Sequence, residues 1–167
     1  MKKTTEITIV QAQITHVQEC LPILIDSILG TYFEPDLALS RLTEGQSKRE
    51  LFVAILGEKV VGFYQMATNG VFLVFPYLHL LAVKTSERGY GIGGKLLAHF
   101  ETLNFEAEGY PFRPKVFLLV SDHNPDAIRF YERHGYTNKA YFDDMFGEGD
   151  TEFLMMKDLG IKKGSNF

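Results

Sequence analysis

The 167-residue sequence predicts an α/β fold whose sheet mixes antiparallel and parallel strand pairs. A hairpin signal lies at 51–67, where two β-rich runs flank the two-residue turn Gly57-Glu58. Farther along, helical periodicity alternates with an almost wholly apolar run at 115–120, which is typical of a strand buried on both faces. The predicted order of elements is β-α-α-β-β-β-α-β-α-β-β. The length suits one core, so we expect residues 1–167 to form a single domain.

The N-terminal part predicts one strand and two helices. Residues 7–10 alternate in hydropathy, as a half-buried strand does. Apolar residues then recur at helical spacing over 14–28, with Pro22 expected near a kink or a boundary. A break at 30–35 separates this helix from a second, short one at 36–42.

The middle of the chain predicts three strands and a helix. The hairpin strands are 51–56 and 59–67, and the Gly-x turn between them suits type II′. A long apolar strand region follows at 72–83, interrupted by Pro76. Apolar residues from Ile92 to Ala107 then repeat at helical intervals.

The C-terminal part predicts a buried strand, a well-marked helix and a last pair of strands. The sequence Asn124-Pro125-Asp126 supplies a capping side chain, a first-turn proline and an acid at the positive end of the helix dipole. Gly135 is expected to end that helix. The last two strands are predicted at 139–145 and 151–157.

Composition sets limits on partners and location. The 17 Lys and Arg against 21 Asp and Glu give a net charge of −4, which argues against general binding to nucleic acid or anionic membranes. The single cysteine, Cys20, excludes an internal disulfide and a cysteine-based metal cluster, and no metal is expected. The apolar runs are shorter than the about 20 residues of a membrane span, and no signal peptide follows Met1. We therefore expect a cytoplasmic protein, either a monomer or a homodimer.

The stretch 88–95, RGYGIGGK, matches parts of three phosphate-binding patterns. In each of them, glycines let backbone N–H groups at a helix N-terminus converge on a phosphate. The dinucleotide pattern G-x-G-x-x-G is disfavoured because its glycines should directly follow the first strand, whereas several strands precede this loop. The P-loop pattern fails because Leu96, rather than Ser or Thr, follows Lys95.

The third pattern, R-x-x-G-x-G, agrees with its surroundings. Arg88, Gly91 and Gly93 supply it, and a second motif follows in the expected order. The residues concerned are Leu81-Ala82-Val83, Arg88-Gly89-Tyr90-Gly91-Ile92-Gly93, Asn124-Pro125-Asp126-Ala127, Tyr131 and Gly135-Tyr136. Together they resemble the GNAT family of N-acetyltransferases, and the resemblance extends from the hairpin to the final strand.

This resemblance implies a splayed mixed sheet with helices on both faces and an acetyl-CoA-dependent transfer of an acetyl group to a primary amine. The acceptor would be a small molecule or a peptide, attacking the thioester directly. The pyrophosphate would lie on the amides of the glycine loop, and free backbone groups near Leu81 and Val83 would pair with the pantetheine arm. The implied acetyl-CoA-binding residues are Leu81, Ala82, Val83, Arg88, Gly89, Tyr90, Gly91, Ile92, Gly93, Gly94, Asn124, Ala127 and Tyr131.

Acetyl transfer needs an acid for the departing thiolate and a base for the amine. The resemblance makes Tyr131 the acid, with a core tyrosine as the alternative. Many relatives carry a glutamate base on the strand before the loop, but residues 76–83 contain none. Strand alternation places His79 on one face with Tyr77, and a similar His-Leu-x-Leu-Ala-Val stretch carries a catalytic histidine in one family member. A hydrogen-bonded sheet histidine is the alternative for His79.

The acceptor is left open between two classes. By the resemblance, acceptor choice depends on the segment between the first two helices and on the last strand pair. Both are acidic, which suits a cationic amine, although solvated turns are commonly acidic too. Both are also aromatic, which suits an apolar amine. The acids are Glu34, Asp36, Asp143, Asp144, Glu148 and Asp150, and the aromatic residues are Tyr32, Phe33, Tyr141 and Phe142.

The alternative function is a CoA-binding regulatory module with the same fold and no turnover.

Overall fold

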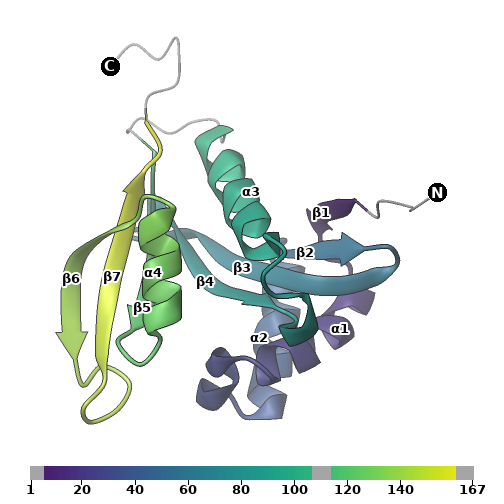
Figure 1. Ribbon diagram of the computed structural model, residues 1–167, viewed down its shortest axis with the longest axis horizontal. Coiled ribbons are helices and arrows are strands. Elements are labelled where there is room, and N and C mark those ends of the chain that lie inside the picture. Colours follow the sequence, from purple (N-terminus) through teal and green to yellow (C-terminus); the bar gives the residue numbers. More distant parts are fainter. Residues whose placement is uncertain (1–5, 107–113, 161–167) are drawn as a thin grey trace. The chain divides into compact units, whose positions relative to one another are not determined.

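The computed structural model describes residues 6–106 and 114–160 and confirms the α/β class (Figure 1). One seven-stranded sheet has the order β1-β2-β3-β4-β5-β7-β6, in which β4 and β5 are parallel and the other registered pairs are antiparallel. The strands are β1 Ile7–Gln11, β2 Leu51–Leu56, β3 Lys59–Val71, β4 Phe75–Val83, β5 Lys115–Ser121, β6 Thr137–Asp143 and β7 Thr151–Asp158. The helices are α1 Ile14–Ile25, α2 Pro35–Ser47, α3 Ile92–Glu106 and α4 Pro125–Arg133, with short 3-10 helices η1 Ile28–Tyr32 and η2 Thr85–Glu87.

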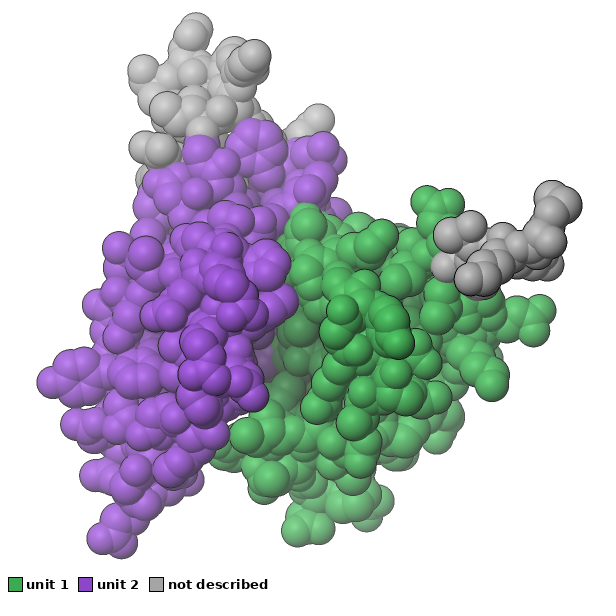
Figure 2. All heavy atoms as spheres, in the orientation of Figure 1, with its two compact units in different colours: residues 1–66, 80–100 green, residues 67–79, 101–167 purple. Residues whose placement is uncertain are grey.

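The chain forms two compact units, coloured separately in Figure 2. The first unit comprises residues 1–66 and 80–100, and the second comprises 67–79 and 101–167. Strand β4 and helix α3 each contribute residues to both units.

The core of the first unit packs α1 and α2 against β2, β3 and the end of β4. Its fully buried members include Val17, Cys20, Leu24, Ala38, Leu42, Val53 and Phe63. Burial, helped by the neighbouring Glu19, raises the pKa of the Cys20 thiol to about 12. The thiol therefore stays protonated and acts as a small core side chain, as its setting in the sequence indicates.

Two predictions for the N-terminal helices were wrong in their boundaries. Helix α1 ends at Ile25, because Ser27 caps η1 by accepting a hydrogen bond from the Leu29 amide at 3.2 Å. Pro22 lies inside α1, and the Asp26 amide still donates to its carbonyl at 3.0 Å. Helix α2 starts at Pro35 and is longer than predicted, with Ala38, Leu42 and Gly45 on its buried face.

Strands β3 and β4 also differ from the prediction. The first extends to Val71, and the chain reverses through Phe72 and Leu73, which both have positive φ angles, of 53° and 58°. Pro76 does not interrupt β4 but is buried within it. Side chains along β4 alternate in burial from there to Val83, as a strand with one covered face requires.

The second unit holds the parallel contact and the last strands. Strand β4 pairs with β5 through Tyr77 opposite Phe117 and Leu78 opposite Leu118. Strand β5 then pairs along its whole length with β7, which also pairs with β6. Strand β6 begins directly after Tyr136, two residues earlier than predicted.

None of the described helices combines the length and the apolar character needed to span a membrane.

Candidate active site

The glycine loop joins the end of β4 to the start of α3 in the first unit. Gly89 and Gly91 have φ angles of 84° and 78°, which residues with a side chain rarely adopt. The Cβ position built on either glycine meets no atom within 4 Å, so the backbone is open on that side. The Arg88 Nε donates to the Val83 carbonyl at 3.1 Å and ties the loop back to the strand.

The first turn of α3 leaves backbone donors for a ligand. The Lys95 amide donates to the Gly91 carbonyl at 3.1 Å, which begins the helical pattern. The preceding amides of Ile92, Gly93 and Gly94 belong to the first turn, whose N–H groups have no partner inside the helix. Ile92 is 2% exposed and anchors this turn in the core. The loop thus fits the pyrophosphate that the sequence predicts for it.

The other predicted residues of this loop and strand are placed as follows. Leu81 and Val83 are half-buried on the less covered face of β4, and Ala82 is buried on the opposite face. Tyr90 is 74% exposed, so its ring does not contribute to the core.

Helix α4 in the second unit begins as predicted. The Asn124 Oδ1 accepts a hydrogen bond from the Ala127 amide at 3.2 Å, which confirms the predicted cap. Gly135 follows the helix with a φ of 88°, the left-handed conformation that ends helices. The Asn124 side chain is therefore engaged in holding the start of α4.

Tyr131 lies on α4 in an aromatic group of the second unit. Its ring centroid is 5.6 Å from that of Tyr136 and 5.2 Å from that of Phe130. Burial, followed by the influence of Tyr77, raises the pKa of the Tyr131 phenol above its ordinary value. The hydroxyl therefore keeps its proton at neutral pH, which a general acid requires.

Tyr77 and His79 lie together on β4, as the alternation predicts. Their ring centroids are 5.0 Å apart with the planes at 84°, and His79 is exposed. Burial raises the pKa of the Tyr77 phenol to about 12. A hydrogen bond with the Leu119 backbone acts in the opposite direction and lowers this pKa, whereas the nearby charge of Glu152 raises it further. The ring of Tyr77 thus contacts that of His79, the predicted base, and Tyr77 is also a minor cause of the raised Tyr131 pKa.

A buried glutamate that sequence reasoning missed belongs to the same unit. Glu152 is 4% exposed at the start of β7 and lies opposite Ser121 of β5, which is 8% exposed. Burial raises the pKa of its carboxyl; the Ser121 hydrogen bond lowers it, nearby Asp150 and Asp122 raise it, and His123 lowers it. In the sequence this residue looks like any glutamate at a strand end, so no local signal marks it.

The acids between β6 and β7 are largely engaged in the loop itself. Asp143 accepts from the Thr151 hydroxyl at 2.9 Å, and Asp144 accepts from the Gly149 amide at 2.6 Å. Asp150 is hydrogen-bonded to the His123 ring at 2.8 Å. By contrast, large apolar side chains are exposed here: Tyr141, Phe142, Met145 and Phe146.

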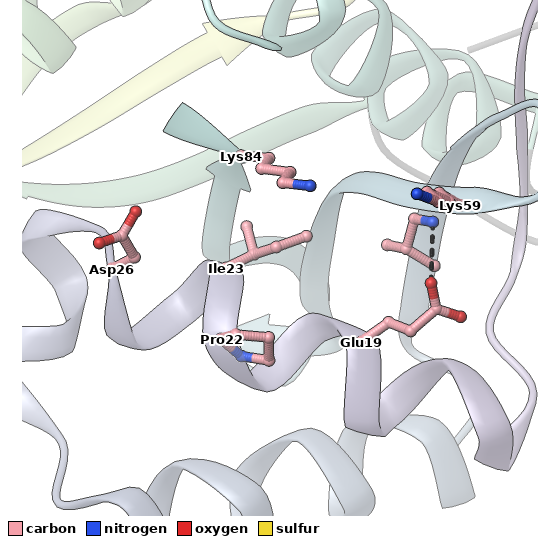
Figure 3. Close-up of a pocket in the computed structure, with 7 residues that line it drawn as sticks. Glu19, Pro22, Ile23, Asp26, Lys59 and Lys84 are labelled. Carbon is pink, nitrogen blue, oxygen red and sulfur yellow. Dashed lines mark hydrogen bonds between the residues drawn. The ribbon is translucent and has the colours of Figure 1, made fainter. Parts of the chain in front are cut away.

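A separate pocket of about 520 Å³ lies in the first unit between α1 and the ends of β3 and β4 (Figure 3). The Glu19 carboxylate accepts from the Val60 amide at 3.1 Å at one side of it, and Asp26 accepts from the Thr85 hydroxyl at 2.9 Å. None of the predicted site residues lines this pocket.

Among the described residues, no group of three or more His, Cys, Asp or Glu side chains is arranged to hold a metal ion.

Comparisons with known proteins agree with the fold. The acetyltransferase (GNAT) domain model matches residues 47–138. An uncharacterized N-acetyltransferase of Methanocaldococcus jannaschii is 31% identical over 116 residues, which are 68% of this chain and 69% of that protein. An aminoglycoside 6′-N-acetyltransferase complexed with coenzyme A superimposes with a TM-score of 0.76 at 17% identity, covering 93% of this chain and 98% of that one. An Arabidopsis thaliana protein in complex with the bisubstrate analogue CoA-Ac-MVNAL gives 0.71 at 17% identity, covering 91% and 98%.

We expect Gly91→Val to weaken CoA binding strongly, because the new side chain strains a backbone with positive φ and fills the open side of the loop. Gly149→Val is the matched control, since Gly149 has a φ of 86° and equally open surroundings in another loop. Calorimetric titration of both folded variants with CoA checks this. Equal affinity in the Gly91 variant and the native protein would show that the loop does not hold the pyrophosphate.

Proposed function

The chain belongs to the GNAT acetyltransferase family, and on that premise we propose that it moves an acetyl group from acetyl-CoA to a primary amine of a small molecule or peptide. Acetyl-CoA is the cosubstrate. The open glycine loop is the observation that supports this function most directly, because its positive φ angles and free first-turn amides suit a pyrophosphate. The loop residues 88–94 would hold the phosphates, and the backbone near Leu81 and Val83 would pair with the pantetheine arm.

The chemistry requires three proton movements. A protonated amine loses one proton before it attacks the thioester carbonyl, and the attacking nitrogen loses another as the new amide forms. The departing thiolate gains one, so that one proton in total passes to solvent. We propose that Tyr131 donates the proton that the departing thiolate gains, since its buried phenol stays protonated. His79 is proposed to take the proton of the ammonium, since its exposed ring can exchange protons with water.

The β6–β7 region favours an acceptor with an apolar body. Three of its four acidic side chains are hydrogen-bonded within the region or to His123, whereas four large apolar side chains are exposed. Tyr141 and Phe142 are exposed on β6, and Met145 and Phe146 are exposed in the loop that follows it. Exposed apolar side chains such as these are suited to contact an apolar ligand. We therefore propose a primary amine carried on an apolar or aromatic group.

Thiol release from acetyl-CoA tests the function against its alternative, a CoA-binding regulatory module without turnover. We expect release to depend on an added amine, with arylalkylamines accepted better than polyamines of similar length. A thiol reagent follows the reaction, and mass spectrometry identifies the acetylated product. Tight CoA binding with no amine-dependent release from a broad panel would favour the regulatory module.

Tyr131→Phe should lower kcat by roughly 10² to 10⁴ while leaving acetyl-CoA affinity nearly intact, because only the proton donor is lost. Tyr136→Phe is the matched control. That neighbouring tyrosine is also buried, and its hydroxyl forms no hydrogen bond of regular geometry within the described residues. Steady-state kinetics on both variants check the role, and a Tyr131→Phe enzyme with native kcat would remove the phenol from the mechanism.

His79→Ala should lower kcat/KM for the amine and abolish the acidic limb of the pH profile, because the variant has no imidazole to be protonated. The activity should fall as the pH is lowered, because a protonated imidazole cannot accept a proton from the amine. His16→Ala, which removes an imidazole from the start of α1, serves as the control. If the limb persists in the His79 variant at full activity, a water relay or an acceptor that arrives neutral is the better account.

A further inference from the structure

Glu152 is a buried carboxylate that forms no ion pair with the residues described by the structure. It is the one Asp or Glu side chain among the described residues that is less than 9% exposed. No Lys, Arg or His nitrogen in the described part of the chain lies within 4.0 Å of it, whereas the half-buried Glu101 has Lys157 at 2.7 Å. Burying a charge without a counter-ion is unfavourable, so such a group is a candidate for a functional role.

The position of Glu152 connects it with the proposed catalytic residues. Glu152 adds to the rise of the Tyr77 phenol pKa that burial causes, and the Tyr77 ring centroid lies 5.0 Å from that of His79. All of these residues belong to the second unit. Tyr77 lies opposite Phe117, Phe117 opposite Met156, and Ser121 opposite Glu152. Because side chains alternate along a strand, Glu152 lies on the same face of the sheet as Tyr77, with β5 between their strands and four residues along β7 from Met156.

The surroundings of Glu152 make its region negative. Asp150 precedes it in the β6–β7 loop, and Asp122 and His123 follow β5. The His123 imidazole is hydrogen-bonded to Asp150 and lies 3.7 Å from Asp122, so the acids nearest to it are these two and not Glu152. Ser121 contributes a neutral hydrogen bond only. The positive charge that would balance Glu152 is thus not supplied by these neighbours.

We propose that Glu152 is a specificity-determining residue that supplies the counter-charge for the ammonium group of the acceptor. The inference rests on the proposed acetyl transfer and refines its substrate class to amines that bind in the protonated form. The carboxylate draws the cation to the vicinity of Tyr77 and His79, where the imidazole then removes the proton. An acceptor of this class combines an ammonium group with the apolar body that the β6–β7 loop favours.

Glu152→Gln tests the proposal, since the amide keeps the shape and the hydrogen-bonding capacity toward Ser121 but removes the charge. We expect the KM of an alkylamine to rise roughly tenfold or more, with kcat nearly unchanged, as loss of ground-state attraction predicts. The KM of an alkoxyamine, which is neutral at pH 7, should stay the same. Glu148→Gln, which removes an exposed acid of the same loop, is the matched control.

The pH dependence and the stability give independent readouts. The carboxyl pKa is raised, so the attraction is present when the group is ionised and is lost as the pH falls through that pKa. The amine KM of the native enzyme should therefore rise toward acid pH, and Glu152→Gln should lose this rise. A raised carboxyl pKa also means that ionisation costs stability as the pH rises, so the variant should be at least as stable as the native protein near pH 8.

The outcomes separate this inference from the proposed function. A native enzyme that acetylates no amine overturns both. A native enzyme that acetylates amines, with equal amine KM in Glu152→Gln, overturns the role of Glu152 alone. Equal rises in KM for both amines and for acetyl-CoA, or a less stable variant, would show a structural role instead. If Glu152→Gln does not fold, Glu152→Asp decides, because it must retain the preference for the charged amine.

Discussion

The alternation of side chains along β4 is the constraint on which the candidate site depends. Leu78, Leu80 and Ala82 are buried on one face of the strand, so Tyr77 and His79 must lie on the other. A shift of one residue would exchange the two faces, and the apolar face would then lose its burial. The buried face therefore specifies on which side of the strand the imidazole and the phenol lie.

Charged and polar groups serve two different purposes in the second unit. Lys157 and Glu101 form a close ion pair, and the Lys157 ammonium also lies 5.8 Å from the Tyr136 ring centroid. The attraction between the two charges offsets the unfavourable free energy of burying them. Glu152 is more deeply buried, and no Lys or Arg among the described residues forms an ion pair with it. The contrast matters because a buried carboxylate without a counter-ion lowers the free energy of unfolding, which is small in natural proteins.

The β6–β7 region shows why composition is a weak guide to an acceptor. Its acidic residues raise the negative charge of the sequence, yet Asp143 and Asp144 hold the loop by accepting hydrogen bonds from Thr151 and Gly149. Four large apolar side chains are exposed in the same region, two on β6 and two in the loop. A count of carboxylates cannot distinguish those that shape a turn from those that attract a ligand, whereas hydrogen-bond partners and exposure can.

The sequence by itself determined the features that are specified within a few residues. The Gly57 turn, the glycine loop before α3 and the Asn124 cap were all predicted correctly, because each depends on local backbone conformations and short-range hydrogen bonds. The family followed from two such local motifs in the expected order. Local signals also misled, since Pro76 was expected to interrupt a strand that in fact contains it.

Only the tertiary structure decided which side chains of distant segments influence one another. Glu152 and Tyr77 are far apart in the sequence, and they come to lie on one face of the same sheet because β5 pairs with β4 on one side and with β7 on the other. The burial that distinguishes Glu152 from an ordinary strand-end glutamate comes from these neighbours and not from its own segment. Strand pairing is a long-range choice made by the whole chain, so a single sequence read locally carries no signal for it.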